Sequence, residues 1–356
     1  MASRRKTAPM NRTRRRYELR NEGLNQRIDE LVGAALAEFG ARGDESAEYA
    51  RQMIVTALRF LRDDPSEGDL KLVNAAIKEL RHALRVFAPY EHVRKVSVFG
   101  SARTPPGHPD WAQAKRFAEQ MVRRGWMVIT GAGSGIMQAA QGGAGRDASF
   151  GVNIRLPFEQ EANEVIAGDA KLVNFRYFFT RKVSFVKHSH AIALFPGGFG
   201  THDEGFETLT LIQTGKCEML PVVFVDAPGG SYWREWAEYL DTHLLARGLI
   251  SPDDTALFRV TDDVDVAVAE ITRFYRNYHS SRYVGDKLVL RLREAPSGPA
   301  LAALSREFKD ILPTGRIEAS AALPEEEGDA PGLARLVLRF DRKSTGRLRR
   351  LIDRLN

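Results

Sequence analysis

The sequence predicts an α/β protein built around a Rossmann-like parallel sheet with flanking helices, an N-terminal helical extension and a small C-terminal α+β module. Two observations support this fold class. Short apolar strands alternate with helical patterns between residues 93 and 280, and glycine-bearing loops follow three of these strands. We expect four segments: a basic disordered arm over residues 1–22, a helical extension over 23–92, the Rossmann-like domain over 93–280 and the α+β module over 281–356.

Three helices are expected ahead of the sheet. Apolar residues at spacings of three and four predict one helix face, formed by Leu70, Val73, Ile77, Leu80, Leu84 and Phe87. Ser66 and Asp69 offer N-cap oxygens in front of that face. Residues 24–31 and 44–61 indicate two earlier helices. These helices carry no recognisable chemistry, so we expect them to pack on the core domain or to form a dimer surface.

The central segment repeats a strand, a loop and a helix. Apolar strands are expected at residues 96–99, 127–130, 191–195 and 222–225. A helical pattern covers residues 111–122, and a further helix opens at Ile136. Ligands of parallel α/β sheets bind beyond the carboxyl ends of the strands. The loops that follow these strands are therefore the first place to look for a site.

The C-terminal segment has a different pattern. Strands are expected at residues 287–293, 316–323 and 334–340, and helices at 300–311 and 345–355. This βαββα order suggests an oligomerisation or regulatory module, and nothing in it resembles catalytic chemistry.

The formal charge of +6 is concentrated at one end of the 356 residues. Residues 1–20 carry a net charge of +7, which leaves −1 for the rest. Nucleic acid is therefore expected as a partner only through the basic arm. Cys217 is the one cysteine, so an internal disulfide is excluded, and neither a metal nor a cofactor is expected. No apolar run approaches the roughly 18 residues of a membrane span, and no signal-peptide pattern occurs, so a cytoplasmic protein without a membrane partner is expected.

Three loops expose backbone N–H groups that suit a phosphate, with a helix following each of the last two loops. Their candidate binding residues are Gly100 and Ser101 in the first loop, Gly131, Gly133, Ser134 and Gly135 in the second, and Gly197, Gly198, Gly200 and Thr201 in the third. A dinucleotide site is disfavoured because Ile136 stands where the third glycine of G-x-G-x-x-G belongs. A P-loop is excluded because no Gly-Lys-Ser/Thr triplet occurs.

Charged residues gather near the third loop. Glu204 and Glu207 share a helix face because they are three residues apart, and Glu207 is a candidate substrate-binding residue. Acidic residues also favour a first helical turn for capping alone, so this pattern has a purely structural alternative. Arg181 and Lys182 lie in an aromatic-rich helical stretch just before the strand at residues 191–195. His202 lies inside the third loop's sequence and is a candidate ligand contact.

Aromatic and histidine residues around this cluster have structural alternatives too. Phe178, Phe179 and Phe185 could stack on a base, although core packing is the stronger expectation. Metal binding by His188 and His190 is disfavoured, because side chains two positions apart at the end of a helix point in different directions.

These residues carry a resemblance. Residues 196–204 read Pro-Gly-Gly-Phe-Gly-Thr-His-Asp-Glu and resemble the PGGxGTxxE signature of the LONELY GUY (LOG) family, proteins once labelled lysine decarboxylases. Arg181 and Lys182 stand where that family has its Arg-Lys pair. The first two loops also resemble the family's, and the similarity covers residues 93–278.

The resemblance implies a phosphoribohydrolase, which hydrolyses the N-glycosidic bond of a nucleoside 5′-monophosphate such as AMP or a cytokinin nucleotide. The products are free base and ribose 5-phosphate. It implies that Arg181 and Glu204 are catalytic and that the nucleotide site is lined by Lys182, Gly197, Gly198, Gly200, Thr201 and Thr210. It also implies a homodimer or larger homo-oligomer, and a nucleotide-binding glutamate that Glu159 or Glu161 could supply. The alternative is a non-catalytic nucleotide-sensing protein with the same fold.

The second loop departs from the family pattern. Ala132, Ser134 and Gln138 stand where the family has Gly, Pro and Glu. We expect the Ala132 side chain to narrow access to the backbone and Gln138 to remove a charge, with consequences for substrate preference. The decarboxylase label would require a lysine that forms a pyridoxal Schiff base, and nothing marks a partner for the pyridine nitrogen.

Overall fold

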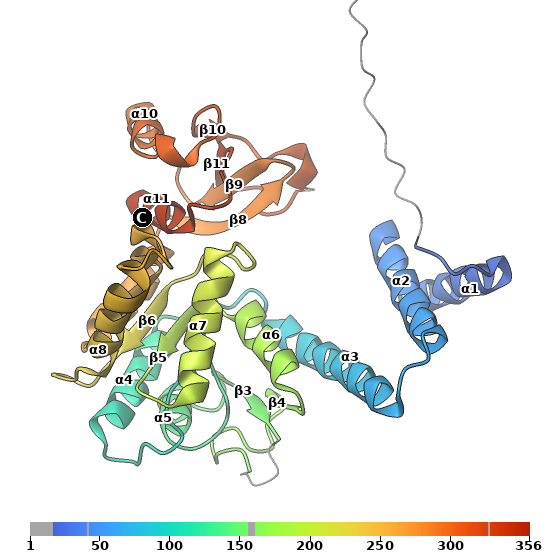
Figure 1. The fold of residues 1–356 in the computed structure, drawn as a ribbon, viewed down its shortest axis with the longest axis horizontal. Coiled ribbons are helices and arrows are strands. Elements are labelled where there is room, and N and C mark those ends of the chain that lie inside the picture. The colour runs from blue at the N-terminus through green and yellow to red at the C-terminus, as the bar shows by residue number, and fades with distance from the viewer. Residues whose placement is uncertain (1–16, 41–42, 156–160, 327) are drawn as a thin grey trace, which may run out of the picture. The chain divides into compact units, whose positions relative to one another are not determined.

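The computed structural model describes residues 17–40, 43–155, 161–326 and 328–356, so most of the predicted basic arm lies outside the described residues. The chain divides into two compact units, Met1–Ala75 and Ala76–Asn356 (Figure 1). No described helix has the length and apolar character that a membrane span requires.

The first unit is helical, as predicted. It contains α1 (Glu22–Phe39) and α2 (Gly43–Arg62), which enclose a small core centred on Ile28, Val32 and Val55. The next helix, α3 (Glu67–Phe87), begins in this unit and ends in the second. Its N-terminus has the predicted cap, because Asp69 N donates to Ser66 Oγ at 3.1 Å while Ser66 N donates to Asp69 Oδ2 at 3.3 Å.

A seven-stranded parallel sheet forms the centre of the second unit and confirms the predicted fold class. Its strands are β1 (Lys95–Phe99), β2 (Met127–Thr130), β3 (Ser149–Ile154), β4 (Leu172–Phe175), β5 (Ala191–Leu194), β6 (Val222–Val225) and β7 (Phe258–Thr261). Their spatial order is β4-β3-β2-β1-β5-β6-β7. The order reverses direction between β1 and β5, which is the switch point where parallel sheets of this kind place their ligands.

Six helices accompany the sheet: α4 (Pro109–Arg123), α5 (Ile136–Ala144), α6 (Phe178–His188), α7 (Phe199–Gln213), α8 (Tyr232–Tyr239) and α9 (Val264–Phe274). Helix α4 packs against α5 and α9, while α6 and α7 lie in front of the sheet in Figure 1. The central strands are buried along their whole length, which explains their mostly apolar sequences. Trp233 and Trp236 of α8 pack on Phe224, as their spacing predicts.

The C-terminal module is an antiparallel sheet of four strands in the order β10-β11-β9-β8. Its elements are β8 (Tyr278–Val284), β9 (Lys287–Leu292), α10 (Gly298–Glu307), β10 (Glu318–Ser320), β11 (Ala334–Leu338) and α11 (Thr345–Leu355). The order is ββαββα, so the expected βαββα order is wrong by one strand. The missed strand is β8, whose polar sequence lacks the apolar pattern of a strand. It begins at Tyr278, ahead of the module boundary expected at residue 281. Shorter helical turns are η1 (Ala88–Tyr90), η2 (Leu240–Leu245), η3 (Pro252–Leu257), η4 (Lys309–Ile311) and η5 (Pro324–Glu326).

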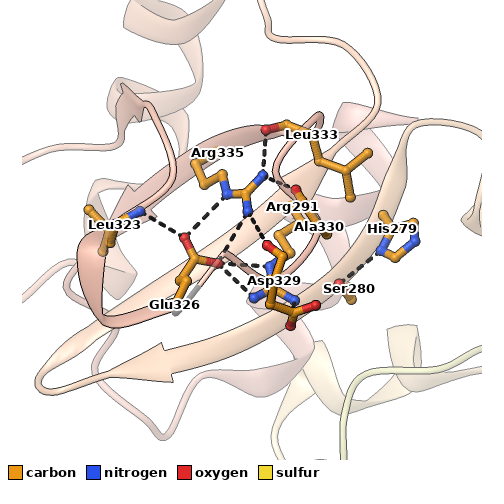
Figure 2. Close-up of polar contacts among 9 residues, drawn as sticks. All are labelled: His279, Ser280, Arg291, Leu323, Glu326, Asp329, Ala330, Leu333 and Arg335. Carbon is orange, nitrogen blue, oxygen red and sulfur yellow. Dashed lines mark hydrogen bonds and ion pairs between the residues drawn. The ribbon is translucent and has the colours of Figure 1, made fainter.

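A buried carboxylate fastens the connection between β10 and β11 to this small sheet (Figure 2). Glu326 is fully buried and accepts hydrogen bonds from Arg291 Nε at 2.8 Å and from Arg335 Nε at 3.2 Å. Burial alone would raise the pKa of Glu326, but the bonds from Leu323 N and from both arginines outweigh it and lower the pKa to about 2. The glutamate therefore stays ionised and holds the loop at every physiological pH.

Candidate active site

The three glycine loops meet at the switch point between β1 and β5. Ser101 N donates a hydrogen bond to Pro196 O at 3.0 Å, and Ile136 N donates to Ser101 O at 3.0 Å. Ser134 Oγ also donates to Ala102 O at 2.8 Å. The loop after β1 is therefore bonded to both of the other loops, and the three form one surface at the carboxyl end of the sheet.

Close packing of these loops requires glycine at particular positions. Gly135 has φ of +64°, and a Cβ there would lie 2.2 Å from Ser101 O. A Cβ at Gly197 would lie 2.2 Å from Thr201 Oγ1 and 2.9 Å from Ser101 N. Nothing lies within 4 Å of a Cβ built at Gly198 or Gly200. These last two glycines therefore leave open space beside the start of α7.

The start of α7 favours an anion. Gly198 is its N-cap residue, and the first N–H groups of a helix have no acceptor within the helix. The helix dipole adds partial positive charge at the same place. Tyr232 supports the loop from α8, because its hydroxyl donates to Gly197 O and bonds with His202 Nε2 at 2.7 Å. His202 thus reaches the loop through Tyr232.

Arg181 reaches the second loop from α6. Its Nε donates to Val152 O at 2.9 Å, and its guanidinium lies over the Phe185 ring. A Cβ built at Gly131 would lie only 2.5 Å from Arg181 Nη2. Gly131 therefore leaves the space that the arginine occupies, which brings a permanent cation to the second loop.

Ala132 does not narrow access to this loop, so that expectation is wrong. The residue is fully buried, and its Cβ faces Gly151 of β3, where a built Cβ would lie 3.1 Å away. The methyl group therefore points into the protein interior. The backbone adopts φ of +62° to achieve this, a conformation that L residues rarely take.

Glu204 is the buried carboxylate of the site. It lies in the second turn of α7 and is only 7% exposed. Burial raises the pKa of Glu204 to about 7, although the positive charges of Lys182 and Arg181 oppose the shift. A carboxyl group with this pKa can accept or release a proton near neutral pH, which is the property that acid–base catalysis requires.

Lys182 connects α6 to α7. Its Nζ lies 2.8 Å from Asp203 Oδ1 and 2.5 Å from Glu207 Oε2. Burial lowers the pKa of Lys182, but these two carboxylates outweigh burial and raise it. The side chain therefore stays a cation, which suits anion recognition and opposes Schiff-base formation, since that reaction needs the neutral amine.

The predicted binding residues do not all share one surface. Lys182 and Glu207 line a cavity of about 630 Å³ between α6, α7 and the segment before β6. Thr210 is exposed, and its Oγ1 donates to Phe206 O at 2.7 Å. Thr210 lies six positions after Glu204, and at roughly 100° per residue the two side chains are about 120° apart around the helix axis, so they occupy different sides of α7. The structure thus brings together the glycine loops, Arg181 and Glu204, with Lys182 beside them and Thr210 apart.

Histidine and aromatic residues near the site have structural surroundings. His188 stacks on Phe87 at 4.0 Å, and His190 Nδ1 accepts from Lys95 N. Burial lowers the pKa of each histidine to about 4, so both are neutral. Phe185 lies in the core as expected, whereas Phe178 and Phe179 are half exposed.

Within the described ranges, no three His, Cys, Asp or Glu side chains are grouped so that they could hold a metal. Of the two candidate glutamates, Glu161 is exposed and Glu159 lies outside the described residues.

The start of α6 is held by a residue that the sequence did not reveal. Glu79 of α3 accepts from Arg176 N at 2.9 Å and from the Thr180 hydroxyl at 2.6 Å. Tyr177, the N-cap residue, makes no capping hydrogen bond with its own side chain. Glu79 therefore anchors the segment that enters the helix carrying Arg181 and Lys182, through one backbone N–H ahead of the helix and one hydroxyl within its first turn. Its separation of 97 residues from Arg176 leaves no local sequence signal.

Replacing Glu79 with Ala is expected to lower the free energy of unfolding by about 1–2 kcal/mol, because Arg176 N loses its acceptor and the buried Thr180 hydroxyl keeps one partner fewer. Urea unfolding measures the change. Glu67→Ala is the matched control on the same helix, since Glu67 pairs with Lys71 in an exposed ion pair. Equal losses in both variants would contradict an anchoring role for Glu79.

Comparison with known proteins agrees with the motifs. Residues 134–271 match the family model described as possible lysine decarboxylase, the older label of the LOG family. Residues 134–271 form a LOG-family domain. The match includes Arg181, Lys182 and the whole third loop of this LOG domain, and it begins inside the second loop. No curated protein sequence matches the chain.

Solved structures with similarity to the chain cover about half of it. The molybdenum cofactor carrier protein of Chlamydomonas reinhardtii is 19% identical, with a TM-score of 0.36 over 51% of this chain and 97% of its own. The molybdenum cofactor binding protein of Rippkaea orientalis is 17% identical, with a TM-score of 0.36 over 51% and 96%. DNA processing protein A of Helicobacter pylori is 14% identical, with a TM-score of 0.35 over 51% and 80%.

Proposed function

We propose that the protein hydrolyses the N-glycosidic bond of a nucleoside 5′-monophosphate and releases free base and ribose 5-phosphate. The observation that carries this proposal is Glu204, a buried carboxyl group with a pKa of about 7 beside a glycine-lined helix start. Burial also raises the pKa of other carboxyl groups in this chain, such as Glu218, so the position of Glu204 near Arg181 and the glycine-lined helix start is what gives its shift a functional meaning. The alternative is a nucleotide-sensing protein of the same fold, which has no need of such a group.

The glycine loops would hold the phosphate of the substrate. The amides at the start of α7 and the open space at Gly198 and Gly200 suit an anion of that size. A phosphate fixed there anchors the ribose, so the sugar cannot drift from the carboxylate during reaction. Arg181, whose guanidinium stays protonated, contributes charge and hydrogen bonds but no proton.

The chemical step is a displacement at the ribose. The bond between C1′ and the base nitrogen breaks, and its electron pair leaves with the base. A water oxygen bonds to C1′, and the proton that water loses passes through Glu204 to the departing base. Positive charge that builds up on the sugar ring is stabilised by the Glu204 carboxylate. Atoms and charges balance without any further reactant.

The proposal also includes the assembly of the protein, its location in the cell and its segment boundaries. A homodimer or larger homo-oligomer and a cytoplasmic location remain predictions, as do the four segment boundaries. The apolar side chains of Phe179 and Val183 on α6 are about half exposed, which is consistent with a surface that another copy covers.

The test is a base-release assay on the full chain. AMP, GMP, CMP, UMP and a cytokinin riboside 5′-monophosphate are incubated separately, and free base and ribose 5-phosphate are measured by chromatography. We expect equal amounts of both products from at least one nucleotide. Nucleotide binding without release would support the sensing alternative, and neither binding nor release would contradict both functions.

A further inference from the structure

The second glycine loop contains a residue in an unfavourable backbone conformation. Ala132 has φ of +62°, whereas glycine would take this conformation without penalty. Both polar groups of its backbone are held. Ala132 N donates to Thr130 Oγ1 at 2.9 Å, and Ala132 O accepts from Asn163 N at 2.8 Å. The surrounding structure thus holds Ala132 in a backbone conformation that an alanine would rarely adopt by itself.

Asn163 makes most of the contacts that hold this loop. Its side-chain Nδ2 lies 3.1 Å from Ala132 O and 2.9 Å from Gly133 O, so two successive loop carbonyls point toward it. Its Oδ1 accepts from Val165 N at 3.2 Å, which fixes the orientation of the amide group. The side chain and the backbone N–H of Asn163 therefore together hold two peptide planes of the loop.

Gln141 connects Asn163 to the sheet. Asn163 Nδ2 donates to Gln141 Oε1 at 2.6 Å, and Gln141 Nε2 donates to Phe150 O of β3 at 3.1 Å. Gln141 is fully buried in α5. The loop is consequently tied through two amide side chains to a buried strand, which is a rigid support.

The orientation of the carbonyls determines the orientation of the amides. In a trans peptide the N–H points opposite to the C=O of the same plane. With Ala132 O directed at Asn163, the N–H of Gly133 is directed to the opposite side. Successive backbone N–H groups turned outward from such a loop form a concave site for an anion.

We propose that Asn163 is a positioning residue that keeps Ala132 in its left-handed conformation and thereby aims the Gly133 amide at the nucleotide phosphate. The part of this proposal that concerns phosphate rests on the proposed function. The part that concerns the coupling of Asn163 to Ala132 does not, and it explains how this chain tolerates alanine at a position where glycine is the easier residue.

The experiment compares Asn163→Ala, Ala132→Gly and the double variant in the full chain. Asn163→Ala is expected to lower the midpoint of thermal unfolding by about 5 °C and to raise the KM for the cleaved nucleotide roughly tenfold, with kcat changed less than about twofold. Adding Ala132→Gly to Asn163→Ala is expected to recover at least half of the KM effect, because glycine adopts the positive φ unaided. Asn163→Asp keeps the shape but not the donors and should resemble Asn163→Ala.

Asn174→Ala is the matched control, since Asn174 lies on β4 and accepts a side-chain hydrogen bond from Asn153 at 3.1 Å. It should leave KM unchanged. A double variant with the same KM as Asn163→Ala would overturn the positioning role. If no nucleotide is cleaved, the midpoints of thermal unfolding still test the coupling of Asn163 to Ala132. A smaller decrease in midpoint from Asn163→Ala in the Ala132→Gly background supports the coupling, and equal decreases in both backgrounds overturn it.

Discussion

Replacing Glu204 with Gln is expected to abolish base release and to make the protein more stable above pH 7. The loss of activity should be roughly 100-fold or more, because the variant can neither transfer the proton nor stabilise charge on the sugar. The gain in stability follows from burial, since the native carboxylate must be ionised in surroundings that oppose its charge. The gap between the ordinary value near 4.5 and a pKa of about 7 corresponds to about 3 kcal/mol of destabilisation at pH 8.

The pH dependence of this gain has a definite sign. The folded protein holds the Glu204 proton more tightly than the unfolded chain, so the native protein gains stability as the pH falls from about 7 toward 4.5. Glu204→Gln should therefore be stabilised relative to the native protein at pH 8 and lose that advantage by pH 5. Turnover of the native enzyme should fall as the pH drops below 7, since the carboxylate becomes protonated.

Glu207→Gln is the matched control, because Glu207 lies three residues later on α7 and pairs with Lys182. It should retain base release within about tenfold and show no stability gain at pH 8, since it loses an ion pair. Urea unfolding at pH 5 and pH 8, with base release measured over the same range, separates the two glutamates. A Glu204→Gln variant that is fully active, or less stable than the native protein at pH 8, would contradict the role assigned to Glu204.

The second large effect is expected at Gly197. Gly197→Ala places a methyl group against Thr201 Oγ1 and against the Ser101 backbone, neither of which can move freely. We expect a loss of about 1–3 kcal/mol in the free energy of unfolding and a loss of base release, because two of the three loops must separate. Gly200→Ala adds the same methyl group where nothing lies within 4 Å.

The two glycines therefore separate folding from binding. Gly200→Ala should keep or slightly raise stability, since alanine is the better helix former. It should still raise the KM for nucleotide, because the methyl group occupies the space left for phosphate. Thermal unfolding and base release on both variants provide the measurement. A stable Gly197→Ala variant, or a Gly200→Ala variant with native KM, would disprove the corresponding half of this prediction.

Much of the fold follows from local patterns. The apolar runs of β1, β2, β5 and β6 predict strands because both faces of a central parallel strand are buried. Edge strands were harder to predict. β4 and β7 lie at the two ends of the sheet and contain Asn174 and Arg259 among their few residues. β8 has a polar sequence because one of its edges has no neighbouring strand in the described sheet.

The residues of the candidate site likewise divide into those that a sequence motif reveals and those that only the folded structure reveals. Its glycine loops and the Arg181–Lys182 pair are contiguous in sequence, so a motif reveals them. Glu79, Tyr232 and Asn163 support those motifs from other elements, and each makes its contacts through hydrogen bonds that span about 30 residues or more. Single polar residues in loops and helices carry no periodic signal, and only the folded chain shows what they hold.

The reversal of strand order at β1 has a consequence for how the protein is made. Val96 of β1 pairs with Ala191 of β5, about 95 residues later in the chain. Closing so long a loop is slow compared with forming a helix or a hairpin. The first two glycine loops therefore emerge from the ribosome well before the third, and no nascent chain that ends ahead of β5 contains a complete site. Catalytic competence should arise late in folding, in the same step that docks the two halves of the sheet.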